Sequence, residues 1–197
     1  MLHRCINNFL LHLRICHPVF ICLVVFSHTY IFAQKIEANF LKGILEQVTP
    51  GGKFSKETKS PIDPFEIFKK ISPTQQVWVS FWQYQNYRYP LFVQEADGEI
   101  EDFFLTFPSF LLRDRMHEQL LAKWGKQQFY QHSNLSALYS WKNIDNNKLS
   151  AVYEANCSIT CFPVSLAMQK NKLKVGIVPL WQQFHQQGLP STKKMKK

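Results

Sequence analysis

After residue 33 the chain contains two cysteines, Cys157 and Cys161, and they are its most reactive side chains. On one continuous strand their Cα atoms would lie about 13 Å apart, whereas a disulfide needs less than about 7 Å. We therefore predict that residues 158–160 form a tight turn, which the cysteines close as a structural disulfide. The alternative is a redox-active pair, although the sequence predicts no following helix that would lower a thiol pKa.

Aromatic residues are concentrated in and after the segment 76–84. On a strand, Trp78, Trp82 and Tyr84 would face one side of the sheet, because side chains alternate. If that side is exposed, these residues form a platform suited to stacking on a sugar ring or gripping a peptide. If helices cover both sides of the sheet, they are core residues instead. We take Trp78, Trp82 and Tyr84 as the candidate ligand-binding residues.

Acidic residues crowd one predicted hairpin, and no basic residue lies among them. They are Glu95, Asp97, Glu99, Glu101 and Asp102. Their spacing does not match a calcium-binding loop, so we predict a solvent-exposed tip. Outside the leader the histidines are His117, His132 and His185, and none is spaced to complete a zinc site. The sequence therefore predicts neither a metal site nor a cofactor.

Catalytic motifs with a recognisable spacing are missing from the sequence. We find no glycine-rich phosphate loop, no Gly-x-Ser-x-Gly and no His-Glu-x-x-His. Asp114, His117 and Glu118 fall on one predicted helix at neighbouring positions. Without a nucleophile or a metal ligand beside them, they are more typical of an exposed helix face. The sequence favours a non-catalytic protein over an enzyme.

Residues 1–33 have the features of a signal peptide. They contain two arginines, no acidic residue and a short apolar core at 19–26, and they end in Ala33. An uncleaved membrane anchor is the alternative, but a spanning helix needs about 18 apolar residues and this run is shorter. We expect cleavage before Gln34. The mature chain would then be exported, either periplasmic or secreted, with no transmembrane segment.

The net charge of +9 is concentrated at the two ends of the chain. The last five residues carry four lysines, and we predict that 191–197 form a basic disordered tail. Residues 34–192 hold 17 basic and 14 acidic side chains. Since no recognition motif accompanies the charge, we expect no nucleic-acid partner.

Residues 34–190 are numerous enough for a single domain with a sizeable core. Apolar periodicity and capping residues predict helices at 36–48, 64–71, 109–124 and 179–187. Alternation and turn residues predict strands at 76–84, 91–96, 99–107, 129–141, 149–157, 162–168 and 173–178. The Asp97-Gly98 pair predicts a type I′ hairpin turn.

Most of the predicted strands follow one another without an intervening helix, which implies antiparallel pairing. We therefore predict an α+β fold, in which helices pack on one face of an antiparallel sheet. Two short similarities favour a tandem arrangement of a helix plus three strands. Residues 70–72 resemble 123–125, and Phe-Pro occurs at both 107–108 and 162–163.

The residues together favour an exported, non-catalytic binding or scaffold module. Its partner would be a protein, a peptide or an envelope glycan, because the aromatic residues of 76–84 suit such partners. The alternative is a thiol–disulfide redox protein that uses Cys157 and Cys161.

Overall fold

The computed structural model describes most of the chain after residue 39. The described ranges are 40–84, 87–133, 136–156 and 163–187. The chain divides into two units, Met1–Phe40 and Leu41–Lys197, and all described residues except Phe40 belong to the second. The predicted signal peptide at 1–33 and the predicted tail at 191–197 lie outside the described residues.

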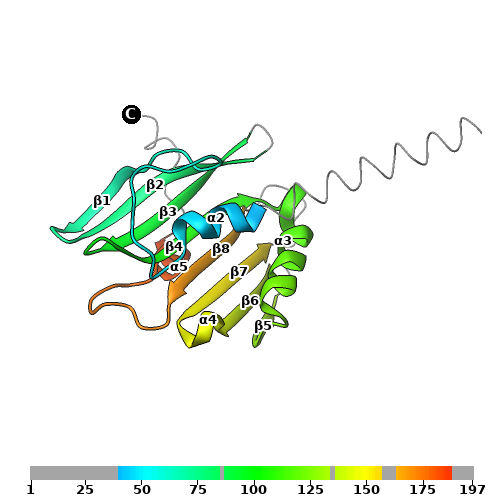
Figure 1. The fold of residues 1–197 in the computed structure, drawn as a ribbon. Coiled ribbons are helices and arrows are strands. Elements are labelled where there is room, and N and C mark those ends of the chain that lie inside the picture. The colour runs from blue at the N-terminus through cyan, green and yellow to red at the C-terminus, as the bar shows by residue number, and fades with distance from the viewer. Residues whose placement is uncertain (1–39, 85–86, 134–135, 157–162, 188–197) are drawn as a thin grey trace, which may run out of the picture. The chain divides into compact units, whose positions relative to one another are not determined.

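Eight strands form one antiparallel sheet in the order β1-β2-β3-β4-β8-β7-β6-β5 (Figure 1). The strands are β1 Glu66–Ser72, β2 Gln75–Tyr84, β3 Tyr87–Ala96, β4 Glu99–Pro108, β5 Phe129–His132, β6 Ser136–Asn143, β7 Leu149–Asn156 and β8 Pro163–Lys170. The helices are α2 Phe40–Val48, α3 Ser109–Trp124, α4 Ile144–Asn147 and α5 Leu180–Gln187. The predicted antiparallel sheet is confirmed, and the fold is mostly β with a few short helices.

The two halves of the sheet meet at strands β4 and β8, which are paired antiparallel. Helix α2 precedes β1–β4 and α3 precedes β5–β8, so each half has four strands rather than the predicted three. The sequence similarities do not mark equivalent places. Residues 70–72 end a strand, whereas 123–125 end a helix, and 107–108 pair with 163–164 across the middle of the sheet. Short matches of this kind arise without any structural equivalence.

Helices pack on both faces of the sheet, so the prediction of one covered face is wrong. His117 of α3 stacks on Tyr153, with 6.0 Å between the ring centroids. Phe184 of α5 contacts Phe104 at 5.0 Å. The register places Tyr153 in line with Leu105, the neighbour of Phe104, so the two helices contact opposite faces. The central strands are apolar on both faces and need a cover on each.

Local signals placed several elements correctly. The described part of the predicted helix 36–48 is α2, and α3 occupies the whole of 109–124. Gly125 follows α3 with φ 73°, and its N–H donates to the Leu121 carbonyl at 2.8 Å, as a helix C-terminus requires. Asp97 and Gly98 both have positive φ, 55° and 80°, which confirms the type I′ turn between β3 and β4.

Three predicted elements are wrong. Residues 64–71 contain the edge strand β1 instead of a helix, because pairing with β2 outweighs the local helix-start signal. The segment 129–141 contains two antiparallel strands, β5 and β6, and the prediction merged them because alternation continues through both and does not mark where β5 ends. Residues 173–178 form an irregular connection to α5, in which Val175 and Val178 are exposed and no residue belongs to a strand.

In the part of the chain that the structure describes, no helix has both the length and the apolar character needed to cross a membrane.

Candidate functional site

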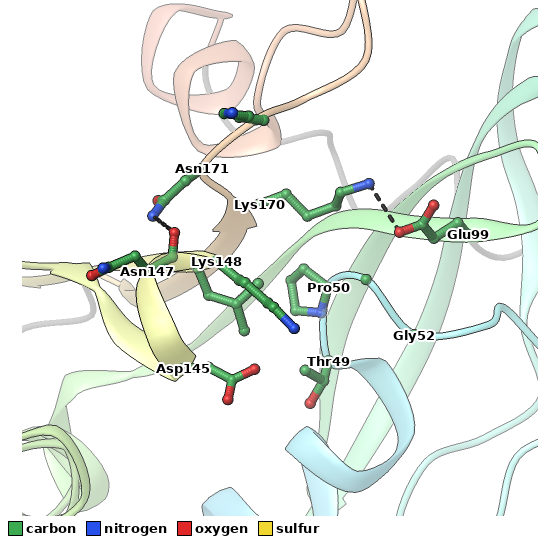
Figure 2. A pocket seen from close by; sticks show the side chains of 12 residues that line it. Thr49, Pro50, Gly52, Glu99, Asp145, Asn147, Lys148, Lys170 and Asn171 are labelled. Carbon is green, nitrogen blue, oxygen red and sulfur yellow. Dashed lines mark hydrogen bonds and ion pairs between the residues drawn. The ribbon is translucent and has the colours of Figure 1, made fainter.

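A cavity of about 680 Å³ lies where β4 and β7 begin and β8 ends (Figure 2). We call it the polar cavity. Its walls are residues 49–52 after α2, Asp145 of α4, residues 147–149, residues 170–172 and Glu99. Its volume falls within the roughly 300–1,000 Å³ typical of small-molecule sites.

The first wall is a loop that backbone hydrogen bonds join to strand β4. The Gly51 N–H donates to the Ile100 carbonyl at 2.7 Å, and the Ile100 N–H donates to the Gly52 carbonyl at 2.9 Å. Gly51 has φ 87°, a conformation that favours glycine. A Cβ at Gly52 would lie only 3.0 Å from the Thr49 carbonyl oxygen. The two glycines therefore allow this tight loop to lie against β4.

The second wall is the turn between β6 and β7. Its φ angles are positive at four non-glycine residues, Asn143, Asp145, Asn146 and Asn147. Asn and Asp tolerate the left-handed region better than other side chains, but the surroundings must hold such a run in place. Asn171 does so from the end of β8. Its N–H donates to the Lys148 carbonyl at 2.8 Å, and its side-chain amide donates to the Asn147 carbonyl at 2.9 Å.

One charge network at the cavity is internally satisfied. The Lys170 ammonium lies 2.9 Å from a Glu99 carboxylate oxygen and 3.1 Å from one of Glu101, a residue with no exposed side-chain surface. Burial lowers the pKa of Lys170, but the two carboxylates outweigh this effect and hold the pKa above its ordinary value. Lys170 therefore stays charged and joins the end of β8 to the start of β4.

Three other charged side chains of the cavity have no partner within the part of the chain that the structure describes. Asp145, Lys148 and Lys172 are exposed, and none forms a side-chain hydrogen bond or ion pair with any residue in the described ranges. Figure 2 shows the Lys148 side chain extending toward the Thr49–Pro50 wall, with the Asp145 carboxylate on the same side. The cavity thus presents one free anion and two free cations to whatever enters it.

The chemistry of the lining suits binding. The twelve lining residues include neither serine, cysteine nor histidine. They supply lysine, carboxylate and asparagine side chains, and the buried Pro50 and Leu149 provide apolar surface. Pockets with an apolar base and a few polar groups orient a ligand by its polar atoms.

The structure does not present Trp78 and Trp82 as an exposed platform. Their exposed fractions are 4% and 1%. A loop provides the cover instead of a helix: the Phe54 ring lies 4.9 Å from that of Trp78, and the Lys56 ammonium lies over the Trp78 ring. Ile62 forms a β-bridge with Trp82. These two tryptophans are core residues, which is the second of the alternatives that the sequence left open.

The exposed part of this aromatic face lies farther along the β2–β3 hairpin. Tyr84 is half-buried, and its ring stacks on that of Trp82 with 5.1 Å between the centroids. The ring of Tyr89, from β3, also stacks on Trp82, with 5.3 Å between the centroids. Tyr87, which is 59% exposed, lies 6.3 Å beyond Tyr89. Burial, together with Tyr87 and Tyr84, raises the pKa of Tyr89. Of the predicted ligand-binding residues, only Tyr84 retains an accessible surface of any size.

The predicted solvent-exposed acidic tip is wrong for three of its five residues. Glu95, Glu101 and Asp102 are buried. Trp78 donates its indole N–H to Glu95 at 3.4 Å, and the Leu180 N–H donates to Asp102 at 2.6 Å. The cations beside the third, Glu101, are Lys170 of β8 and Lys174 of the connection after it, which the hairpin sequence does not reveal.

Asp97, the exposed acid of the hairpin tip, pairs with Lys174 of the connection after β8. The Lys174 ammonium lies 2.8 Å from Asp97, and this hydrogen bond holds the pKa of Asp97 below its usual value. The Lys174 N–H also donates to Glu101 at 3.3 Å. The segment after β8 is therefore held against the start of β4.

The remaining predicted sites are placed as follows. Cys157 and Cys161 lie outside the described residues, so their disulfide stays a prediction. His117 is half-buried against Tyr139 and Tyr153, whereas Asp114 and Glu118 are exposed. Among the residues with a described placement, no group of three or more His, Cys, Asp or Glu is arranged to hold a metal ion.

Sequence reasoning did not find the polar cavity. The Pro-Gly-Gly of 49–52 and the Asp-Asn-Asn of 145–147 are compositions typical of turns. Nothing in those compositions indicates that the two turns lie on either side of the end of β8.

No protein-family model, curated protein or solved structure shows a significant match to the chain.

Proposed function

We propose that the protein is an exported, non-catalytic binding module, and that the polar cavity holds a polar group of a peptide or glycan partner. The observation that carries this proposal is a cavity of ligand size lined by three charged side chains, Asp145, Lys148 and Lys172, that have no partner among the described residues. Charged groups already paired, such as Lys170 with Glu99, form the frame around them.

The walls of the cavity are organised before any ligand arrives. Gly51 and Gly52 are hydrogen-bonded to β4, and Asn171 holds the left-handed turn beside β7. A ligand that enters a preformed site orders few additional groups, so more of its contact energy appears as affinity. This favours binding as the role of the cavity.

Chemical-shift mapping by NMR tests the proposal. We would titrate the isotope-labelled protein with N-acetylglucosamine oligomers and with short peptides that carry free termini. We expect at least one class to shift the amide signals of 49–52, 145–149 and 170–172. Shifts confined to other surfaces, or none with either class, would contradict the assignment of this cavity.

Paired variants test the residues. The double change Asp145→Asn with Lys148→Met should abolish the shifts, because it removes charges of both signs from one wall. Lys142→Met is the matched control, since Lys142 is an exposed lysine of β6 that does not line the cavity. Turnover of a disulfide substrate that depends on Cys157 would instead support the redox alternative.

A further inference from the structure

The polar cavity has a charge pattern that narrows its ligand class. Asp145 and Lys148 are the first and last residues of one turn, in which the Lys148 N–H donates to the Asp145 carbonyl at 3.2 Å. The Cα atoms at the ends of such a turn are within about 7 Å of each other. Their charged groups nevertheless form no ion pair within 4.0 Å. A free anion and a free cation therefore lie at neighbouring places on one wall.

Ligands with a single charge fit this wall poorly. A purely anionic group that approaches Lys148 also approaches the Asp145 carboxylate, and a purely cationic group that approaches Asp145 also approaches the Lys148 ammonium. Glu99 does not change this balance, because Lys170 already neutralises it at 2.9 Å. Like charges placed together in a binding site weaken binding and exclude the wrong partners.

We propose that the polar cavity binds a zwitterionic amino-acid group, one that carries a free ammonium and a free carboxylate on the same carbon atom. The ligand ammonium pairs with Asp145, and its carboxylate pairs with Lys148. Pro50 and Leu149, which are buried beside these residues, accommodate an aliphatic part of the ligand. The proposal rests on the binding function above and specifies the polar group that is recognised.

Three leucine derivatives test the proposal by removing one charge at a time. L-Leucine has both charges, N-acetyl-L-leucine lacks the ammonium, and L-leucinamide lacks the carboxylate. Affinities would be measured from the amide shifts of residues 145–149. We expect leucine to bind about three- to tenfold more tightly than either analogue, the range of partly exposed charge pairs. Equal affinity for all three, or tighter binding of either analogue, would overturn the proposal.

Two variants assign each charge to its residue. Asp145→Asn should lower the affinity for leucine to that for N-acetyl-leucine, and it should not weaken binding of N-acetyl-leucine itself. Lys148→Met should lower the affinity for leucine to that for leucinamide, and it should not weaken binding of leucinamide itself. Lys142→Met should leave all three affinities unchanged. If both variants weaken the binding of all three compounds by equal factors, Asp145 does not recognise the ligand ammonium and Lys148 does not recognise the ligand carboxylate.

The outcomes also separate this inference from the proposed function. If leucine produces no shifts but a peptide or glycan shifts the cavity residues, the zwitterion proposal fails while the binding function stands. If no ligand of any class shifts them, both fail. Asp145 and Lys148 are exposed, so the melting temperatures of their variants should stay close to that of the wild type. The leucine series on the unchanged protein decides the matter even if a variant does not fold.

Discussion

Replacing Asp102 by asparagine should remove a large pH dependence from the stability of this fold. Asp102 is 2% exposed, and it lies on β4 beneath the start of α5, where one carboxylate oxygen accepts the Leu180 N–H at 2.6 Å. The other oxygen is buried with no hydrogen-bond partner among the described residues. Burial, with a contribution from Glu101, raises the pKa of Asp102 to about 8.

The sign of the effect follows from proton binding. The unfolded chain releases the Asp102 proton near its ordinary pKa of 3.8, whereas the folded protein keeps it up to about pH 8. The folded state therefore binds more protons in this window, and its stability falls as the pH rises. One proton changes the free energy of unfolding by about 1.4 kcal/mol per pH unit, or about 3 kcal/mol between pH 5 and pH 7. For a domain of this size that corresponds to a melting-temperature change of about 6–10 °C.

Thermal melting of the wild type and of Asp102→Asn between pH 5 and pH 8 measures this contribution. The amide still accepts the Leu180 N–H but does not titrate. We expect the melting temperature of the variant, relative to that of the wild type, to rise by about 6–10 °C between pH 5 and pH 7. Asp145→Asn, at an exposed position, should follow the wild type at every pH. Parallel curves for Asp102→Asn and the wild type would refute the raised pKa of Asp102.

Two further predictions concern the first half of the sheet. Gly98→Val should cost about 1–2 kcal/mol, because a β-branched residue resists the φ of 80° in the type I′ turn, whereas Gly43→Ala in α2 should be neutral or stabilising. Unfolding by denaturant measures both, and an unchanged midpoint for Gly98→Val would show that the turn relaxes without strain. Trp82→Ala should cost about 3–5 kcal/mol, since this side chain is buried. Tyr87→Ala, at an exposed position, should change the melting temperature by only a few degrees, and equal losses for the two would contradict the assignment of Trp82 to the core.

Local sequence signals determined the parts of the fold that neighbouring residues specify by themselves. The Asp97-Gly98 turn, the helix α3 with Gly125 after it, and the antiparallel character of the sheet all follow from short-range patterns. Each depends on interactions within a few residues, such as a left-handed turn or a hydrogen bond four residues along the chain. These interactions are similar in any tertiary surrounding.

Local signals failed where a distant partner decides the outcome. The helix-start pattern at 63–66 leads into strand β1, because β2 supplies a pairing partner. Trp78 and Trp82 are core residues because the loop before β1 covers them, and the sequence around the tryptophans does not reveal that cover. Secondary structure at such places is set by the tertiary surroundings and not by intrinsic preference.

Charges and the cavity depended on tertiary structure most of all. The buried Glu101 pairs with the ammonium of Lys170, which lies 69 residues later in the chain. The walls of the polar cavity come from three separate segments, 49–52, 145–149 and 170–172. Turn residues and charged residues predominate among them in the sequence, but composition does not encode which turns meet. Their meeting follows from the antiparallel register of β4, β7 and β8, which brings the starts of two strands to the end of the third. Long-range pairing of this kind is decided by how the whole sheet buries its two apolar faces, and only the folded chain satisfies that condition.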